Sequence, residues 1–381
     1  MHSIGKLLVA TLMMTAVTQA VSAPVVQQVS GTLNHGGTIV ISGSAFGTKA
    51  TAAPLVWDDA TSDNISEKWD GTWPSTIPPY NTDYHSPMRD IDLPHNHDIR
   101  YIAGDHYAPN LATAVPGGAT GGGNVVVFKN IDLPQPFNIY ASWYQRLDNA
   151  WTFGTDNNIK TFAYSVCCSP YQLPDDWYTG YGPPHPTSSS DRGSQWGIND
   201  DGKSLMRPDV NGHNFWWGSA VNPTAGKWSK VEVAVKVTEQ NDGYIQVHEN
   251  GKLVVNYAGP TDKYPGTART IGIGGWSLIK APNNWRYFAD IYLDTSLSRV
   301  VLANNPVLSE ATIIENQIPS SWSATVITAT VNLGQFQAGQ TAYLFVVDST
   351  GTPSASGLPV SVGNDTADAP IPNPPSGVTV R

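Results

Sequence analysis

The chain has 381 residues, of which 35 are Gly, 29 are Pro and only 14 % are charged. Its 31 acidic residues comprise six Glu and therefore 25 Asp, and the formal net charge is −10. Asp, Gly, Pro and Thr favour turns and strands, whereas Glu, Lys and Arg favour exposed helix faces. The composition therefore argues against a helical bundle or a doubly wound α/β protein and predicts an all-β protein. The negative charge and the lack of a basic run argue against a nucleic acid or an anionic membrane as partner.

The N-terminal segment has the pattern of a secretory signal peptide. Lys6 precedes an apolar stretch over residues 7–17, and small residues follow at Ala20 and Ala23. We assign residues 1–23 to the signal, with cleavage after Ala20 as an alternative. No other stretch is long and apolar enough to cross a membrane. We therefore expect a secreted, extracellular or cell-surface protein, with the periplasm as a further compartment, and no membrane insertion once the signal is removed.

Two stretches near opposite ends of the chain carry complementary strand patterns. Residues 24–57 contain a strand, a Gly-Gly turn at 36–37 and a second strand that leads into a Gly-rich loop around Phe46. This order resembles the opening half of a TIG-type (IPT) immunoglobulin-like domain. Residues 305–364 hold Val-rich strands separated by turns and resemble the closing half of the same domain.

The resemblance implies one split immunoglobulin-like domain, with residues 58–304 inserted as a second domain. Insertion into an exposed loop is feasible when the termini of the inserted domain lie close together. Two separate small β domains are the alternative. Residues 365–381 are rich in Pro and are expected to form a linker or an extended arm.

The later part of the inserted region alternates apolar and polar residues. Val residues occupy every second position from 231 to 237, and Asn250-Gly251 separates two alternating runs, which predicts a hairpin. The segment Trp228-Ser229-Lys230-Val231, this hairpin and a late strand at 287–294 resemble a concanavalin A-like (laminin-G-like) jelly roll over residues 125–300. The expected fold is thus all-β: a concanavalin A-like jelly-roll sandwich plus a small immunoglobulin-like β-sandwich.

Several predicted strands present polar groups on one face. With a period of two, Tyr244, Gln246 and His248 lie opposite Ile245 and Val247. The same counting groups Tyr144 with Arg146, and Asp290 with Tyr292 and Asp294. Such a face suits a saccharide groove, because sugar hydroxyls need hydrogen-bond partners and sugar rings stack on aromatic side chains. The residues expected to contact a glycan are Tyr144, Lys160, Trp177, Tyr178, Trp196, Trp217 and Tyr244.

Three functions compete. The favoured one is recognition of a polysaccharide or cell-surface glycan without catalysis, and a structural extracellular or appendage protein is another. An enzyme is the remaining class, because Gln246-Val247-His248 is similar to the Gln-Ile/Val-His strand of jelly-roll alginate lyases, although their Tyr-x-Lys-x-Gly-x-Tyr strand has no counterpart here. That resemblance implies β-elimination on a uronic-acid polymer, with Gln246 neutralising the carboxylate and His248 as base. Tyr292, Tyr144 and Tyr164 are the candidates for the phenol, and Arg146 and Lys160 are the candidates for the cation.

Two further possibilities concern acidic residues. A glycoside hydrolase of the laminarinase type needs a pair of catalytic carboxylates, usually on a Glu-x-Asp-x-Glu strand. The corresponding residues here, 290–294, contain no Glu, which argues against this class. Jelly-roll carbohydrate domains often hold calcium, so Asp290 and Asp200 are candidate calcium ligands. No cofactor is certain, and the sequence leaves the oligomeric state open.

Overall fold

The computed structural model describes residues 22–61, 67–73, 99–102, 110–115, 122–147, 149, 158–165, 193–198, 204–209, 225–261, 268–278 and 284–363. Within these residues the protein consists of strands and turns, with one short 3₁₀ helix, η3 (Leu308–Glu310), and no α-helix. The described part of the chain contains no helix that could span a membrane. The expectation of an all-β protein is confirmed.

Two antiparallel sheets pack face to face as a jelly roll. One has six strands, in spatial order β11 (Ser204–Asp209), β10 (Gly193–Ile198), β9 (Asn158–Ser165), β15 (Ala268–Leu278), β7 (Gly122–Asp132) and β4 (Gly71–Trp73). The other has the order β14 (Lys252–Ala258), β13 (Tyr244–Glu249), β12 (Ser229–Val237), β8 (Phe137–Leu147), β16 (Asn284–Asp294), β6 (Asn110–Val115) and β5 (Ile99–Ile102), and β3 (Val56–Asp58) also pairs with β16.

The core of the jelly roll lies between these sheets because each central strand turns its apolar residues inward. The alternating Val residues of β12 are fully buried there, together with Ile245 and Val247 of β13 and Trp143 of β8. Trp143 stacks on Phe162 of the opposite sheet, with ring centroids 5.8 Å apart. The turn at Asn250-Gly251, with φ of 49° and 74°, closes the predicted hairpin between β13 and β14.

A second, smaller sandwich is built from both ends of the described chain. Its strands follow the order β1 (Val25–Gly31), β2 (Thr38–Ser44), β19 (Val326–Thr330), β18 (Ile314–Trp322), β17 (Arg299–Ala303), β20 (Thr341–Val347) and β21 (Leu358–Ser361). Ile41 pairs with Ile327, so β2 lies beside a strand from the far end of the sequence. Side chains from both segments, such as Ile39, Phe46 and Leu344, share one apolar core. We call this unit the small sandwich.

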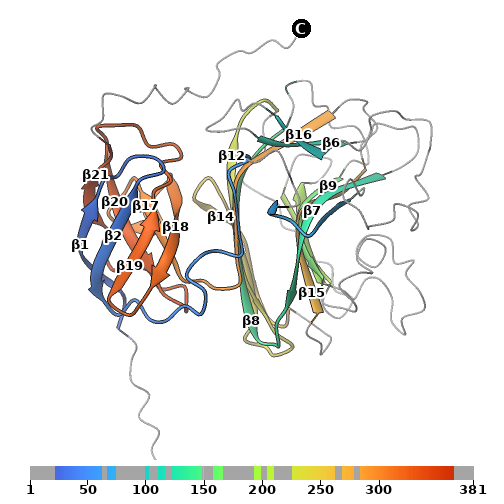
Figure 1. Ribbon diagram of the computed structural model, residues 1–381. Coiled ribbons are helices and arrows are strands. Elements are labelled where there is room, and N and C mark those ends of the chain that lie inside the picture. The colour runs from blue at the N-terminus through green and yellow to red at the C-terminus, as the bar shows by residue number, and fades with distance from the viewer. Residues whose placement is uncertain are drawn as a thin grey trace, which may run out of the picture.

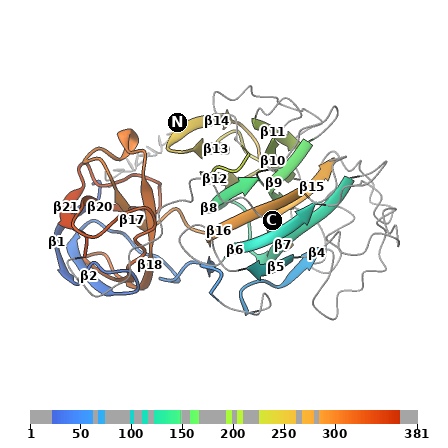
Figure 2. The same ribbon diagram turned by 90° about the horizontal axis from the view of Figure 1, so that it is seen from above.

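The boundaries between the two units differ slightly from those expected. β3 pairs with β16 and therefore belongs to the jelly roll, although residues 56 and 57 were expected in the other unit. β17 pairs with β18 and β20, so the second segment of the small sandwich starts at Arg299 rather than at 305. Figures 1 and 2 show the small sandwich beside the eight-stranded sheet, on the side away from the six-stranded sheet.

Candidate functional site

The outer face of the eight-stranded sheet carries rows of polar and aromatic residues that run across strands. Register pairs Glu232 with His248 and Ala234 with Gln246, so these side chains project from the same face. The burial of β13 alternates between half-buried Tyr244, Gln246 and His248 and buried residues between them. The predicted face of this strand is therefore present, and it points toward the small sandwich.

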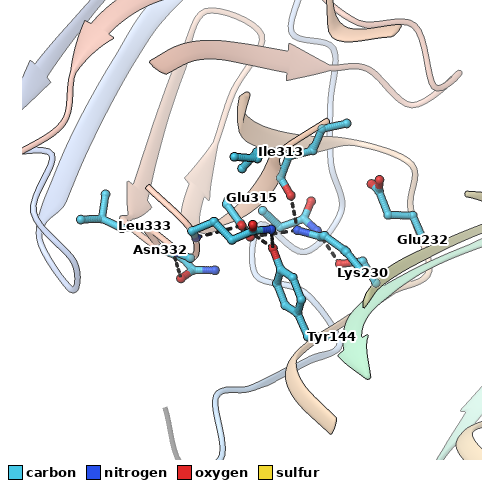
Figure 3. Close-up of polar contacts among 12 residues, drawn as sticks. Tyr144, Lys230, Glu232, Ile313, Glu315, Asn332 and Leu333 are labelled. Carbon is cyan, nitrogen blue, oxygen red and sulfur yellow. Dashed lines mark hydrogen bonds and ion pairs between the residues drawn. The ribbon is translucent and has the colours of Figure 1, made fainter. Parts of the chain in front are cut away.

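The small sandwich covers part of this face, and a buried polar cluster forms the contact between the two units (Figure 3). The Tyr144 hydroxyl donates to Oε1 of Glu315 at 2.5 Å, and Lys230 Nζ lies 2.9 Å from Oε2 of the same carboxylate. Gln335 donates to the Tyr144 hydroxyl at 2.8 Å, and Asn316 donates to Ser142 at 2.7 Å. Because Glu315 is fully buried, these contacts fix the small sandwich against the sheet.

The late strand β16 contributes a second buried group of acids to the junction. A β-bulge lies between Ala289 and Tyr292, and Asp290 within it has a left-handed φ of 50°. Burial, and then the charge of Glu315, raise the pKa of Asp290 to about 7. Asp294 forms an ion pair with Lys49 of the small sandwich. The distance from Oδ2 to Nζ is 2.6 Å, and both side chains are buried.

Next to these clusters, the two units leave a pocket of about 640 Å³ between them. Its jelly-roll wall includes Tyr140, Glu232, Tyr244, Gln246 and His248. Its opposite wall comes from the small sandwich and the segment that leads into it, and includes Leu297, Arg299, Leu308, Ser309, Ile314 and Thr350. The pocket is thus completed only when both units are in place.

Burial shifts the pKa values of the ionisable groups on the jelly-roll wall of the pocket. Desolvation lowers the pKa of His248 below its ordinary value of 6.5; the charge of Glu232 opposes this shift and that of Arg299 adds to it. Desolvation also raises the pKa of the Tyr244 and Tyr140 hydroxyls above 10.0. At neutral pH the pocket therefore holds a neutral imidazole and protonated phenols.

The predicted site residues separate into two groups. Tyr244, Gln246 and His248 line the pocket. Tyr144 and Tyr292 do not, because the small sandwich covers Tyr144 and Tyr292 is fully buried beside Tyr140 and Leu297. Neither of these two can contact a polysaccharide in this arrangement, which corrects the expectation for both. Arg146 lies outside the pocket wall, with its guanidinium 4.2 Å from the ring centroid of Tyr287.

Other predictions fall outside what the structure describes. Trp177, Tyr178, Trp217 and Asp200 lie outside the described residues. Lys160 and Trp196 lie on β9 and β10, but only their backbone is described. No group of three or more His, Cys, Asp or Glu side chains in the described ranges could hold a metal ion. Calcium at Asp290 and Asp200 stays a prediction.

Three residues that shape the pocket were not predicted from the sequence: Tyr140, Glu232 and Arg299. Tyr140 donates to Oε1 of Glu232 at 2.6 Å, and the Arg299 guanidinium carbon lies 4.1 Å from the Tyr140 ring centroid. The hairpin register would have placed Glu232 beside His248, and period-two counting would have placed Tyr140 on the same face as Tyr144. No local signal marks Arg299, because it reaches the pocket from the other unit.

No protein-family profile and no curated protein sequence matches the chain. Among solved structures, the chain is similar to an endo-β-1,4-glucuronan lyase from the fungus Trichoderma reesei, at 12 % identity and a TM-score of 0.41, over 52 % of this chain and 87 % of that one. It is also similar to a PL-14 alginate lyase from Aplysia kurodai, at 12 % identity and a TM-score of 0.36, over 52 % and 87 % of the two chains. For the Emp47p carbohydrate recognition domain the identity is 12 % and the TM-score 0.34, over 53 % and 90 %.

Proposed function

We propose that the protein binds a polysaccharide and holds a short segment of it in the pocket between the jelly roll and the small sandwich. The observation that carries this proposal is the wall formed by Tyr244, Gln246 and His248, three polar side chains on one face of β13 that open into a single pocket. The pocket volume lies within the range of about 300–1,000 Å³ that is usual for ligand sites.

The chemistry of this wall suits sugar hydroxyl groups, which both donate and accept hydrogen bonds. Gln246 offers an amide with donors and an acceptor, and its only partner in the described chain is Asn256, at 3.3 Å. The neutral imidazole of His248 offers one donor and one acceptor, and Tyr244 adds a hydroxyl and a ring face. We infer from the N-terminal pattern that this binding takes place outside the cytoplasm.

The test is calorimetric titration of the mature protein with a panel of soluble oligosaccharides. We expect Gln246→Ala to weaken binding by about 5- to 10-fold, since one hydrogen bond contributes about 1 kcal/mol. Gln28→Ala, the same substitution on exposed strand β1, serves as control and should leave binding unchanged. Equal effects of both variants, or no binding by the wild type, would overturn the proposal.

A second candidate function is β-elimination at the same pocket. Its specific support is a neutral His248 beside Gln246 and a protonated Tyr244. In a uronate chain, His248 would take the C5 proton, the C4–oxygen bond would break as the C4–C5 double bond forms, and Tyr244 would donate its proton to the departing oxygen. Ultraviolet absorbance of the unsaturated ends measures this reaction.

The lyase candidate makes a distinct prediction for His248. Turnover should vanish in His248→Ala but persist in His35→Ala, where the imidazole is on the small sandwich outside the pocket wall. Activity should also rise with pH through a value below 6.5, because burial lowers the pKa of His248 and the base must be neutral. Binding without any rise in absorbance would support the carbohydrate-binding function and contradict the lyase function.

A further inference from the structure

Arg299 is a cation of the small sandwich that lies in the wall of the pocket. A guanidinium group has five N–H donors. One Nη1 hydrogen bond to the carbonyl oxygen of Leu297, at 2.9 Å, accounts for its polar contacts among the described residues. Its Nε is buried without a hydrogen-bond partner in the same part of the chain. The Nη hydrogens that do not contact Leu297 are therefore the donors left for a ligand.

Arg299 forms no ion pair within the described wall. The other charged residue there is Glu232, and its carboxylate accepts the 2.6 Å hydrogen bond from the Tyr140 hydroxyl. No described carboxylate lies within ion-pair distance of Arg299. The remaining ionisable groups of the wall are His248, Tyr140 and Tyr244, which are neutral at neutral pH.

The position of Arg299 is held before any ligand arrives. Its guanidinium lies over the ring of Tyr140, with 4.1 Å between the guanidinium carbon and the ring centroid. The hydrogen bond from Nη1 to the Leu297 carbonyl restrains the group further. A planar guanidinium held in this way can bind two oxygen atoms of one anionic group at little entropic cost.

We propose that Arg299 selects a glycan that carries an oxyanion, either the carboxylate of a uronic acid or a sulfate ester, and that Gln246 binds the same sugar from the opposite wall. This inference rests on the proposed polysaccharide-binding function. It makes the small sandwich a determinant of ligand choice rather than a spacer, because a jelly roll without it would lack the cation.

The experiment compares three oligosaccharide probes by calorimetry: an oligouronate, the same oligouronate after reduction of its carboxyl groups, and a sulfated oligosaccharide with a neutral backbone. The variants are Arg299→Gln and Arg299→Lys. Lys252→Gln is the control, since it removes the same charge from an exposed position on β14 outside the pocket wall. Thermal unfolding of each variant verifies that it is folded.

We expect the wild type to prefer a charged probe, and Arg299→Gln to weaken binding of that probe by about 10- to 100-fold, as for loss of a charge-assisted hydrogen bond. Binding of the reduced probe should change by less than about 3-fold, and Arg299→Lys should be intermediate. The probe that loses affinity identifies the anion as carboxylate or sulfate.

Two results would overturn the role of Arg299 while polysaccharide binding stands. In one, the wild type binds the reduced probe as tightly as the charged ones. In the other, Arg299→Gln weakens all probes equally. If the wild type binds no probe and no neutral glycan, both are overturned.

Discussion

The hydroxyl group of Tyr144 and the carboxylate of Glu315, 171 positions apart in the sequence, share a buried hydrogen bond of 2.5 Å. Lys230 approaches the second oxygen of the same carboxylate. Glu315 belongs to the small sandwich, whereas the other two residues belong to the jelly roll. The pocket beside this cluster therefore depends on a charged contact that neither unit contains alone.

Glu315→Gln should destabilise the protein by about 3–5 kcal/mol, because it leaves the buried ammonium group of Lys230 without its counter-charge. Urea unfolding followed by tryptophan fluorescence measures this change. Asp242→Asn is a matched control, since it breaks the Lys236–Asp242 ion pair, whose aspartate side chain is 63 % exposed. Its expected cost is about 0–1 kcal/mol. Equal costs for the two variants would contradict the structural role of Glu315.

Asp290 should make stability depend on pH. The native pKa of about 7 exceeds the ordinary 3.8, so between these values the folded chain holds a proton that the unfolded chain releases. Proton binding by Asp290 therefore stabilises the folded state fully below about pH 3.8. This stabilisation decreases as the pH rises from 3.8 and is lost above about 7. Its size is on the order of 4 kcal/mol.

Asp290→Asn imitates the protonated acid and should remove this component. We expect the variant to match the wild type near pH 4 and to be more stable near pH 8, as measured by urea unfolding across that range. EDTA is included so that calcium, the ion suggested by the sequence, does not hold the carboxylate ionised. Parallel pH profiles for the two proteins would show that Asp290 titrates as an ordinary carboxyl group.

Filling the pocket should weaken the proposed glycan binding without unfolding the protein. Ser309 is exposed on η3 at the pocket wall, and an indole at this position would occupy space that a ligand needs. Ser309→Trp should weaken binding at least about 10-fold in calorimetry, with thermal unfolding unchanged. Ser30→Trp, on the exposed face of β1, is the control. If Ser309→Trp retains the affinity of the wild type, the ligand does not bind in this pocket.

Gly251 lies where the hairpin of the jelly roll touches the small sandwich. Its φ is 74°, and a Cβ there would lie 2.5 Å from the carbonyl oxygen of Ala311. Gly339 has a similar φ of 84° but open space around it, so Gly339→Ala should cost only the backbone strain of about 1–2 kcal/mol. Gly251→Ala should cost about 1–3 kcal/mol more, owing to the clash. Urea unfolding of the pair separates the two effects, and equal losses would mean that the hairpin tip can move away.

Local patterns in the sequence predicted the parts of the fold that depend on neighbouring residues. The alternation in β13 placed Tyr244, Gln246 and His248 on one face, and Asn250-Gly251 located the turn. The assumption that alternate residues share a face was wrong where the backbone departs from a regular strand. The bulge at Asp290 shifts the pairing of β16, so Ala289 aligns with Tyr144 and shares the outer face with Tyr292, although a period of two groups Tyr292 with Asp290 instead.

Contacts between the two units could not be predicted in this way. Tyr144 has the sequence context of an exposed polar strand residue, and only the docking of Glu315 buries it. Three of the six Glu residues (232, 249 and 315) are buried, although acidic side chains are rarely buried without a partner, and the sequence does not mark which of them contact the other unit. Arg299 is likewise unmarked in the sequence, since its neighbours in the pocket come from distant strands.

The pairing of β2 with β19 affects when the small sandwich, and with it the pocket, can be completed during biosynthesis. β1 and β2 leave the ribosome first, yet the strand that completes their sheet follows the entire jelly roll. The jelly roll can therefore fold while the N-terminal hairpin still waits for its partner strand. A nascent chain interrupted before Val326 would carry the jelly-roll wall of the pocket but not Thr350, Gly351 and Pro353 of the opposite wall, so the pocket would be complete only after the last strands of the small sandwich are made.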